Sequence, residues 1–245
     1  MKVQPVFAAF KEDGATIVKV DYSNEEELKQ ALTGVEVVVS VIGAWALGVQ
    51  VDIAKAAKAV GVQLFVPAEL GIRLTVVVNK IKKVVQEALE ELDLPYTLFY
   101  IGYFAEDFHG FLGFEYANGK VQIAGSVDIA FSMTSRLDVA RFVAHALTTA
   151  EPADLEWAKI PIEGDRKTHK EIAAIAEKKF DKPMQLEYLD LEETRKGYNS
   201  DIVAFFMTVI ADGDAVSGSE EDVKAAIAKF YPDWNPKPID EFIQL

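Results

Sequence analysis

The sequence predicts an α/β protein built on a parallel, doubly wound sheet. Two observations carry this prediction: β-prone runs alternate with helical patterns over the first hundred residues, and the central runs are apolar nearly throughout. Continuously apolar strands are typical of sheets covered on both faces, and repeated β-α-β connections produce parallel strands with right-handed crossovers. The length of 245 residues allows a substantial core without disulfide staples.

The first part of the chain supplies the elements of this sheet in order. Apolar or β-branched composition predicts strands at Ala15–Asp21, Val35–Ile42, Val62–Pro67 and Pro95–Ile101. Helical periodicity predicts helices from Ser23 to about Leu32, over Val51–Val60 and over Lys80–Leu92. Ser23 and Glu26 form an S-x-x-E capping box at the start of the first of these helices.

A second, smaller α+β part follows. Residues 102–134 are rich in aromatic side chains, and Asn118-Gly119 between short apolar runs predicts a hairpin. Capping signals at Ser135 and at Thr168 with Glu171 start two helices. Further elements are predicted as strands at Trp157–Glu163 and Met184–Leu189 and as helices at 200–211 and 219–229. We therefore expect a core at 1–101 and, at 102–245, a cap lobe interwoven with the last strands of that core.

Composition excludes several classes of function. The chain has no cysteine and three histidines, which argues against disulfides, thiolate chemistry and a His-rich metal site, so no metal is expected. A net charge of −14 argues against nucleic acid and anionic lipid as partners. No 18-residue apolar run is present. We expect a soluble, cytoplasmic protein whose partner is a small-molecule substrate.

In order along nearly the whole chain, the sequence resembles the NmrA-like and isoflavone-reductase-like atypical short-chain dehydrogenases, in particular the fungal NmrA-like branch. The matching stretches are Gly14–Thr33, Val35–Gly43, Phe65–Gly71, Leu94–Thr97, Thr134–Leu147 and Tyr231–Trp234. The resemblance implies a Rossmann-like core that binds NADP or NAD, a C-terminal substrate lobe, and reductase activity in many members. Some members of the family are instead nucleotide-sensing regulators.

One family feature is absent from the sequence. A dinucleotide-binding core begins with a strand, a glycine-rich turn and a helix, and neither G-x-G-x-x-G nor G-x-x-G-x-x-G occurs here. By the resemblance, Val6–Asp13 corresponds to the second crossover helix, so the sheet is expected to be N-terminally incomplete or rearranged. Ile72–Val78 is β-prone, and we hypothesise that it adds a strand or covers the exposed sheet; its alternative is an exposed loop. An open sheet edge would favour a homodimer.

The candidate catalytic residue is Lys82. By the resemblance it corresponds to the catalytic lysine of the family, a general acid/base beside the nicotinamide and the substrate carbonyl. A lysine can serve this role when burial or a nearby positive charge lowers its pKa. The alternative is that Lys80, Lys82 and Lys83 form a solvated helix face, and Val84 replaces a second family lysine.

Candidate cofactor-binding residues lie at the ends of predicted strands, where α/β proteins bind ligands. They are Asp21, Tyr22, Gly43, Ala44, Pro67, Ala68 and Glu69. Gly43 permits a close backbone approach to a ribose or phosphate, although we favour its interpretation as a turn glycine. Glu69 either orients a ligand or caps the next turn, and Ala68 replaces a family serine.

The aromatic region supplies the candidate substrate pocket. Tyr103, Phe104, Phe108 and His109 are its members, because aromatic side chains with a few polar groups line small-molecule sites. They also fill ordinary cores. Together with this region, the family resemblance implies an NAD(P)H-dependent reductase of a small carbonyl or aromatic metabolite. The alternatives are a non-catalytic ligand-sensing regulator of the same family, a cofactor-free isomerase or lyase, and a truncated chain.

Overall fold

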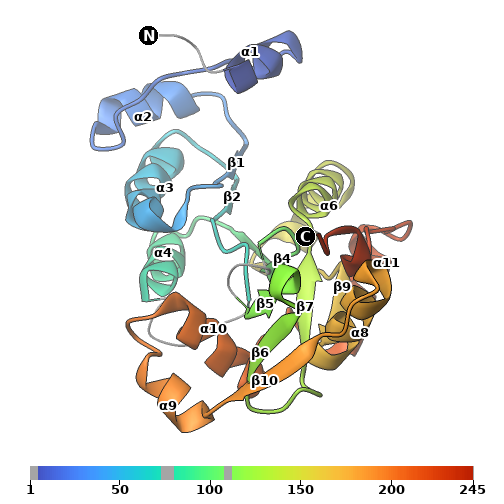
Figure 1. The fold of residues 1–245 in the computed structure, drawn as a ribbon. Helices are drawn as coiled ribbons and strands as arrows, with labels where there is room; N and C mark the ends of the chain where they lie inside the picture. The colour runs from blue at the N-terminus through green and yellow to red at the C-terminus, as the bar shows by residue number, and fades with distance from the viewer. Residues whose placement is uncertain (1–4, 73–79, 108–111, 245) are drawn as a thin grey trace. The chain divides into compact units, whose positions relative to one another are not determined.

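The chain forms two compact units (Figure 1). The computed structural model describes residues 5–72, 80–107 and 112–244. The N-terminal unit comprises Met1–Ala68 with Lys82–Pro95, and the C-terminal unit comprises Glu69–Ile81 with Tyr96–Leu245. This division differs from the expected boundary at residue 101, because the last strand assigned to the core pairs within the C-terminal unit.

The N-terminal unit contains a β-α-β crossover. Strand β1 (Val37–Val39) pairs in parallel with β2 (Leu64–Val66), as the apolar runs predicted. The connecting chain forms η1 (Ala44–Val49) and α3 (Gln50–Ala59). The other helices of this unit are α1 (Pro5–Glu12), α2 (Glu25–Leu32) and, from Lys82 onward, α4 (Lys80–Glu91).

The prediction of a strand at Ala15–Asp21 is wrong. These residues take no regular secondary structure, and Ile17 and Val18 are 39% and 55% exposed. A strand is stabilised by a hydrogen-bonded neighbour and by burial of one face. Among the described residues, no strand pairs with this segment, so its β-branched composition alone does not make it a strand.

The start of α2 also differs from the prediction. The N-cap is Asn24 rather than Ser23, and the Asn24 side chain accepts a hydrogen bond of 3.2 Å from the Glu27 N–H. Ser23 instead donates both its hydroxyl and its backbone N–H to the Asp21 carboxylate, at 2.7 and 2.9 Å. The N-cap is thus shifted by one residue. The Glu27 carboxylate accepts from the Asp21 N–H at 2.8 Å and from the Asn24 side-chain amide at 3.0 Å, while the Asn24 N–H donates to the Asp21 carbonyl, so the reciprocal bond of a capping box is not made.

The described residues of the C-terminal unit form three small sheets. Strand β3 (Thr97–Tyr100) pairs in parallel with β8 (Ala158–Pro161). The second sheet has the order β4 (Tyr103–Phe104), β7 (Ala130–Thr134), β9 (Asp165–Thr168). The third has the order β10 (Gln185–Leu189), β6 (Lys120–Ala124), β5 (Phe114–Glu115). Parallel pairs occur in all three sheets, in keeping with the expected α/β class.

The described helices of the C-terminal unit are η3 (Tyr116–Asn118), α6 (Arg136–Thr149), α7 (Pro152–Leu155), α8 (His169–Phe180), α9 (Leu191–Lys196), α10 (Ile202–Ala211), α11 (Glu220–Phe230) and η4 (Ile239–Glu241). Two of them, α6 and α8, begin at the predicted capping signals. Ser135 caps α6, and Thr168 with Glu171 forms a complete capping box on α8. Gly119, at φ +65°, makes the predicted turn between β5 and β6.

The core of the C-terminal unit is aromatic and aliphatic. Phe114, Phe131, Ile172 and Phe205 belong to one buried cluster. The hypothesis of a strand at 72–78 concerns residues 73–79, which lie outside the described residues. Within the described part of the chain, no helix is long and apolar enough to cross a membrane.

Candidate functional site

The parallel pair β1–β2 brings four predicted cofactor residues to one edge of the N-terminal unit. Gly43 and Ala44 follow β1, and Pro67 and Ala68 follow β2. The Ser40 N–H donates to the Val66 carbonyl at 2.8 Å, which extends the pairing to the carboxyl ends of both strands. Carboxyl ends of parallel strands are the usual ligand edge of an α/β sheet.

Two polar residues at this edge were not predicted from the sequence. Ser40 is 6% exposed, and its Oγ has no hydrogen-bond partner among the described residues. Gln50, 1% exposed, accepts from the Ala68 N–H at 2.8 Å and donates to the Leu47 carbonyl at 3.0 Å. Gln50 therefore fixes the turn after β2. The one sequence feature that could have indicated this role is that Gln50 is a polar residue at the start of an Ala-rich helix.

Lys82 lies on the first turn of α4 and is half-buried. Val85 and Leu89, three and seven positions further along, are the buried residues of this helix, so Lys82 borders the buried face. Lys83 is exposed and forms an ion pair of 3.4 Å with Glu87. The three lysines of the cluster thus differ in burial, and Lys82 is not simply part of a solvated face.

Asp21 and Tyr22 are exposed residues ahead of α2. Hydrogen bonds from the Ser23 backbone and then the Ser23 hydroxyl lower the pKa of Asp21 below its ordinary value, which keeps the carboxylate charged. Tyr22 is 45% exposed. Whether either residue contacts a nucleotide stays a prediction.

The remaining predicted site residues belong to the C-terminal unit. Glu69 is 3% exposed, and Tyr103 is 8% exposed. Burial raises the pKa of the Tyr103 phenol, and its ring packs edge-on against Phe206 at 5.1 Å, so Tyr103 is a core residue. Phe104 is half-buried, with the Arg136 guanidinium 4.7 Å from its ring centroid. Phe108 and His109 lie outside the described residues.

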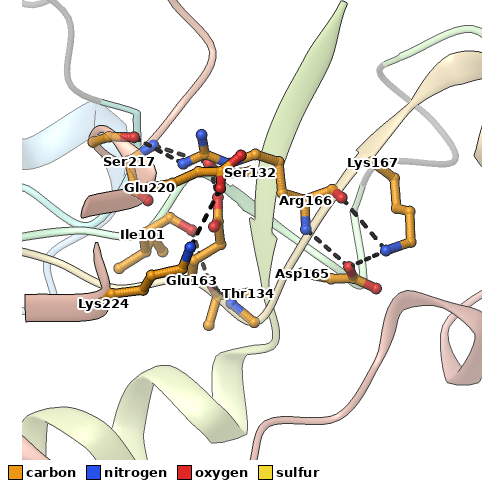
Figure 2. Close-up of polar contacts among 12 residues, drawn as sticks. Ile101, Ser132, Thr134, Glu163, Asp165, Arg166, Lys167, Ser217, Glu220 and Lys224 are labelled. Carbon is orange, nitrogen blue, oxygen red and sulfur yellow. Dashed lines mark hydrogen bonds and ion pairs between the residues drawn. The ribbon is translucent and has the colours of Figure 1, made fainter. Parts of the chain in front are cut away.

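A polar cluster on β7 and β9 was also not predicted (Figure 2). Ser132 is fully buried and donates its hydroxyl to Glu163, whose Oε1 also accepts from Arg166 Nε at 2.7 Å. The guanidinium further donates to the Gly218 carbonyl at 2.8 Å, and Ser132 Oγ accepts from the Ser217 N–H at 3.0 Å. These contacts join three segments that are distant in sequence, around Ser132, Glu163–Arg166 and Ser217–Gly218, which sequence periodicity cannot indicate.

The edge at β1–β2 fits part of a dinucleotide. A buried, unpartnered Ser40 hydroxyl, with open space around the Gly43 Cα, suits a hydrogen-bonding ribose or amide that approaches the backbone. The pyrophosphate of an extended dinucleotide normally rests on a glycine-rich turn at a helix N-terminus. The sequence contains no such motif, so no residue is assigned to the pyrophosphate.

These features define an α/β protein with a ligand edge at the ends of parallel strands. The chain belongs to the NmrA-like family, whose pattern matches residues 2–243. It is 26% identical to a phenylcoumaran benzylic ether reductase of Pinus taeda, over 96% of this chain and 82% of that protein. It is 25% identical to an isoflavone reductase of Cicer arietinum, over 98% of this chain and 81% of that protein.

Solved structures show the same fold. AtPrR2 with NADP+ and (+)pinoresinol superposes with a TM-score of 0.83 at 21% identity, over 97% of this chain and 85% of that one. The leucoanthocyanidin reductase–NADPH complex of Vitis vinifera has a TM-score of 0.80 at 20% identity, over 98% and 86%. The α/β, Rossmann-like fold expected from the sequence is confirmed, and both of these neighbours carry NADP(H).

Proposed function

We propose that this protein is an NAD(P)H-dependent oxidoreductase that reduces a small carbonyl or aromatic metabolite. The observation that carries the proposal is family membership over residues 2–243, with reductases among the relatives along almost the whole chain. The NADP(H)-bearing structural neighbours support the cofactor class. Affiliation with the fungal branch, loss of the glycine-rich strand–turn–helix and a homodimer stay predictions.

In this proposal, some residues of the N-terminal unit bind the cofactor and another donates a proton to the substrate. Ser40 and Gly43 would hold the ribose–nicotinamide portion of the cofactor, and Gln50 would keep the Ala68 turn in place. When bound, the reduced nicotinamide supplies a hydride. The Lys82 ammonium donates a proton to the substrate oxygen, which becomes negative as the carbonyl carbon is reduced. Being half-buried, Lys82 can then recover its proton from water.

Titration with NADPH and NADH by calorimetry tests the cofactor step. We expect one of the two to bind with a Kd tighter than about 1 mM, equivalent to about −4 kcal/mol. Ser40→Ala should weaken that binding about tenfold, equivalent to about 1.4 kcal/mol, through loss of one hydrogen bond. Failure of both nucleotides to bind in this range would overturn the proposal.

The role of Lys82 is tested by turnover. NADPH oxidation is measured against a panel of aromatic ketones and enones, with the 4-deuterated cofactor used to confirm transfer to product. Lys82→Ala should lower kcat at least about 100-fold, the usual contribution of a general acid, while changing the Kd of NADPH little. Lys83→Ala, next to it but exposed and paired with Glu87, is the matched control and should retain activity. Equal activity of both variants removes Lys82 from the mechanism.

A non-catalytic, ligand-sensing member of the family is the second candidate. It follows from the prediction, which stays a prediction, that the glycine-rich turn normally used for tight dinucleotide binding is lost. This candidate predicts that nucleotide or metabolite binding occurs without turnover in any variant. A cofactor-free isomerase or lyase predicts turnover that is unaffected by removal of NADPH.

A further inference from the structure

A cavity of about 390 Å³ lies in the C-terminal unit between the edge strand β8 and helix α11. Its wall includes Tyr100 and Pro161, the last residues of the parallel strands β3 and β8. The carboxyl end of parallel strands is where α/β proteins place ligands, and small-molecule pockets begin at roughly 300 Å³. None of the residues predicted for the cofactor or substrate belongs to this wall.

Ser217 in this wall lacks a partner for its side chain. The residue is 0% exposed, and its Oγ forms no hydrogen bond with any part of the chain that the structure describes. Its backbone N–H is already used by Ser132 Oγ at 3.0 Å. A buried hydroxyl without a partner costs about 1–3 kcal/mol, and a bound polar ligand would remove this cost.

The wall that carries Ser217 is held rigidly. Arg166 donates to the Gly218 carbonyl at 2.8 Å while its Nε is fixed on Glu163 at 2.7 Å (Figure 2). Gly218 lies against Pro161, where an added Cβ would come within 2.9 Å of the proline ring. The polar cluster of β7 and β9 therefore positions one side of the cavity before any ligand arrives, as a preorganised site requires.

Two lining charges of opposite sign are available to a ligand. Within residues 5–72, 80–107 and 112–244, neither the Lys159 ammonium nor the Asp222 carboxylate takes part in an ion pair or side-chain hydrogen bond, with each other or with other groups. Lys229, by contrast, is bound to Asp154 at 2.9 Å. The apolar remainder of the wall includes Phe230, which is 7% exposed.

We propose that this cavity binds a small zwitterionic molecule with an apolar or aromatic body, of the size and charge pattern of an aromatic amino acid. Lys159 receives the carboxylate and Asp222 the ammonium group. The apolar wall at Pro161 and Phe230 covers the body. The Ser217 hydroxyl, which is buried without ligand, reaches the polar head by rotation of its side chain. The assignment does not depend on cofactor binding or on Lys82.

Amide NMR and calorimetry on the full chain test this assignment with L-phenylalanine as the probe. We expect titration to shift the amides of Ser217 and Gly218 and to give a Kd of about 1 mM or tighter. Benzoate and benzylamine each keep the ring but carry a single charge. Both should bind at least about tenfold more weakly. Binding of either one as tight as that of L-phenylalanine would overturn the zwitterion assignment.

Variants locate the binding. Lys159→Ala, Asp222→Asn and Ser217→Ala should each weaken L-phenylalanine binding about tenfold or more. Glu220→Gln is the matched control, because Glu220 is exposed on α11, does not line the cavity, and forms an ion pair with Lys224 at 3.5 Å. This variant should bind like the parent. The proposal is refuted if the Ser217 and Gly218 amides do not move up to about 20 mM probe, or if all three cavity variants bind like Glu220→Gln.

Discussion

Protonation of His169 should weaken the C-terminal unit as the pH falls. The ring is 2% exposed, stacked on Phe114 at 5.4 Å and tilted against Phe131 at 5.1 Å. Burial lowers the pKa of His169 from 6.5 to about 4, and the Leu112 backbone opposes this only in part. The folded protein thus holds this imidazole neutral at pH values where the unfolded chain already protonates it.

The size of the effect follows from the two pKa values. Between 6.5 and about 4 the unfolded state binds one more proton than the folded state, so stability falls as the pH falls. Each pH unit in this window removes at most about 1.4 kcal/mol. The loss begins below about 6.5, levels off below about 4, and totals about 3 kcal/mol from this residue.

The assay is urea unfolding of the parent and of His169→Phe between pH 4.5 and 7.5. Phenylalanine keeps a planar ring between Phe114 and Phe131 but cannot take up a proton. The free-energy difference between the two proteins should shift by about 2 kcal/mol over this range, in favour of the variant at low pH. A difference that stays constant with pH would refute the reasoning, because the folded pKa of His169 would then be ordinary.

Three further substitutions test the packing and the polar cluster by urea unfolding at neutral pH. Gly102→Ala should lower the free energy of unfolding by at least about 3 kcal/mol, because φ is +71° and a Cβ would lie 2.2 Å from a backbone oxygen of β7. Gly61→Ala, where the Cβ would meet open space, should lower it by about 1 kcal/mol. Glu163→Gln should cost about 2 kcal/mol, since its carboxylate is 12% exposed and paired, while the exposed Glu220→Gln should cost under about 0.5 kcal/mol. Ser135→Ala should cost about 1–2 kcal/mol through loss of the α6 cap. Equal costs within either matched pair, or an unchanged Ser135→Ala, would contradict these expectations.

Helix starts could be predicted from the sequence because their signals are local. Thr168 and Glu171 bond each other's backbone within one turn, and no distant residue decides the outcome. The shift from Ser23 to Asn24 shows the limit of this rule. Both residues are good caps followed three positions later by a glutamate. The Ser23 hydroxyl is engaged by Asp21, a contact that the capping pattern does not contain.

Strands were less predictable because they depend on a partner. Val35–Ile42 and Ala15–Asp21 are both rich in β-branched residues, yet only the first contains a strand, which pairs with β2. Composition measures how well a residue suits a pleated, half-buried surface and does not identify the neighbour. To predict which of these segments becomes a strand, the order of strands in the sheet would have to be known first.

The candidate site divides in the same way. Gly43 and Ala68 come together because strand ends of a parallel pair share an edge, which the β-α-β pattern already implies. Ser40 and Ser217 could not be singled out in advance. A serine is ordinarily satisfied by backbone or water, and its lack of a partner emerges only when all surrounding groups are placed.

Both orphaned hydroxyls allow a direct test of whether a ligand is their partner. Ser40→Ala and Ser217→Ala remove no hydrogen bond that the described residues make, so each variant alone should be as stable as the parent or up to about 1 kcal/mol more stable. Ser135→Ala is the matched contrast, since Ser135 is equally buried but bonded to Asp138 at 2.7 Å. With ligand present, the parent should become more stable than Ser40→Ala and Ser217→Ala, because ligand binding stabilises the parent more than it stabilises either variant. If both alanine variants lose as much stability as Ser135→Ala without ligand, their hydroxyls have partners within the protein, and the argument from both sites fails.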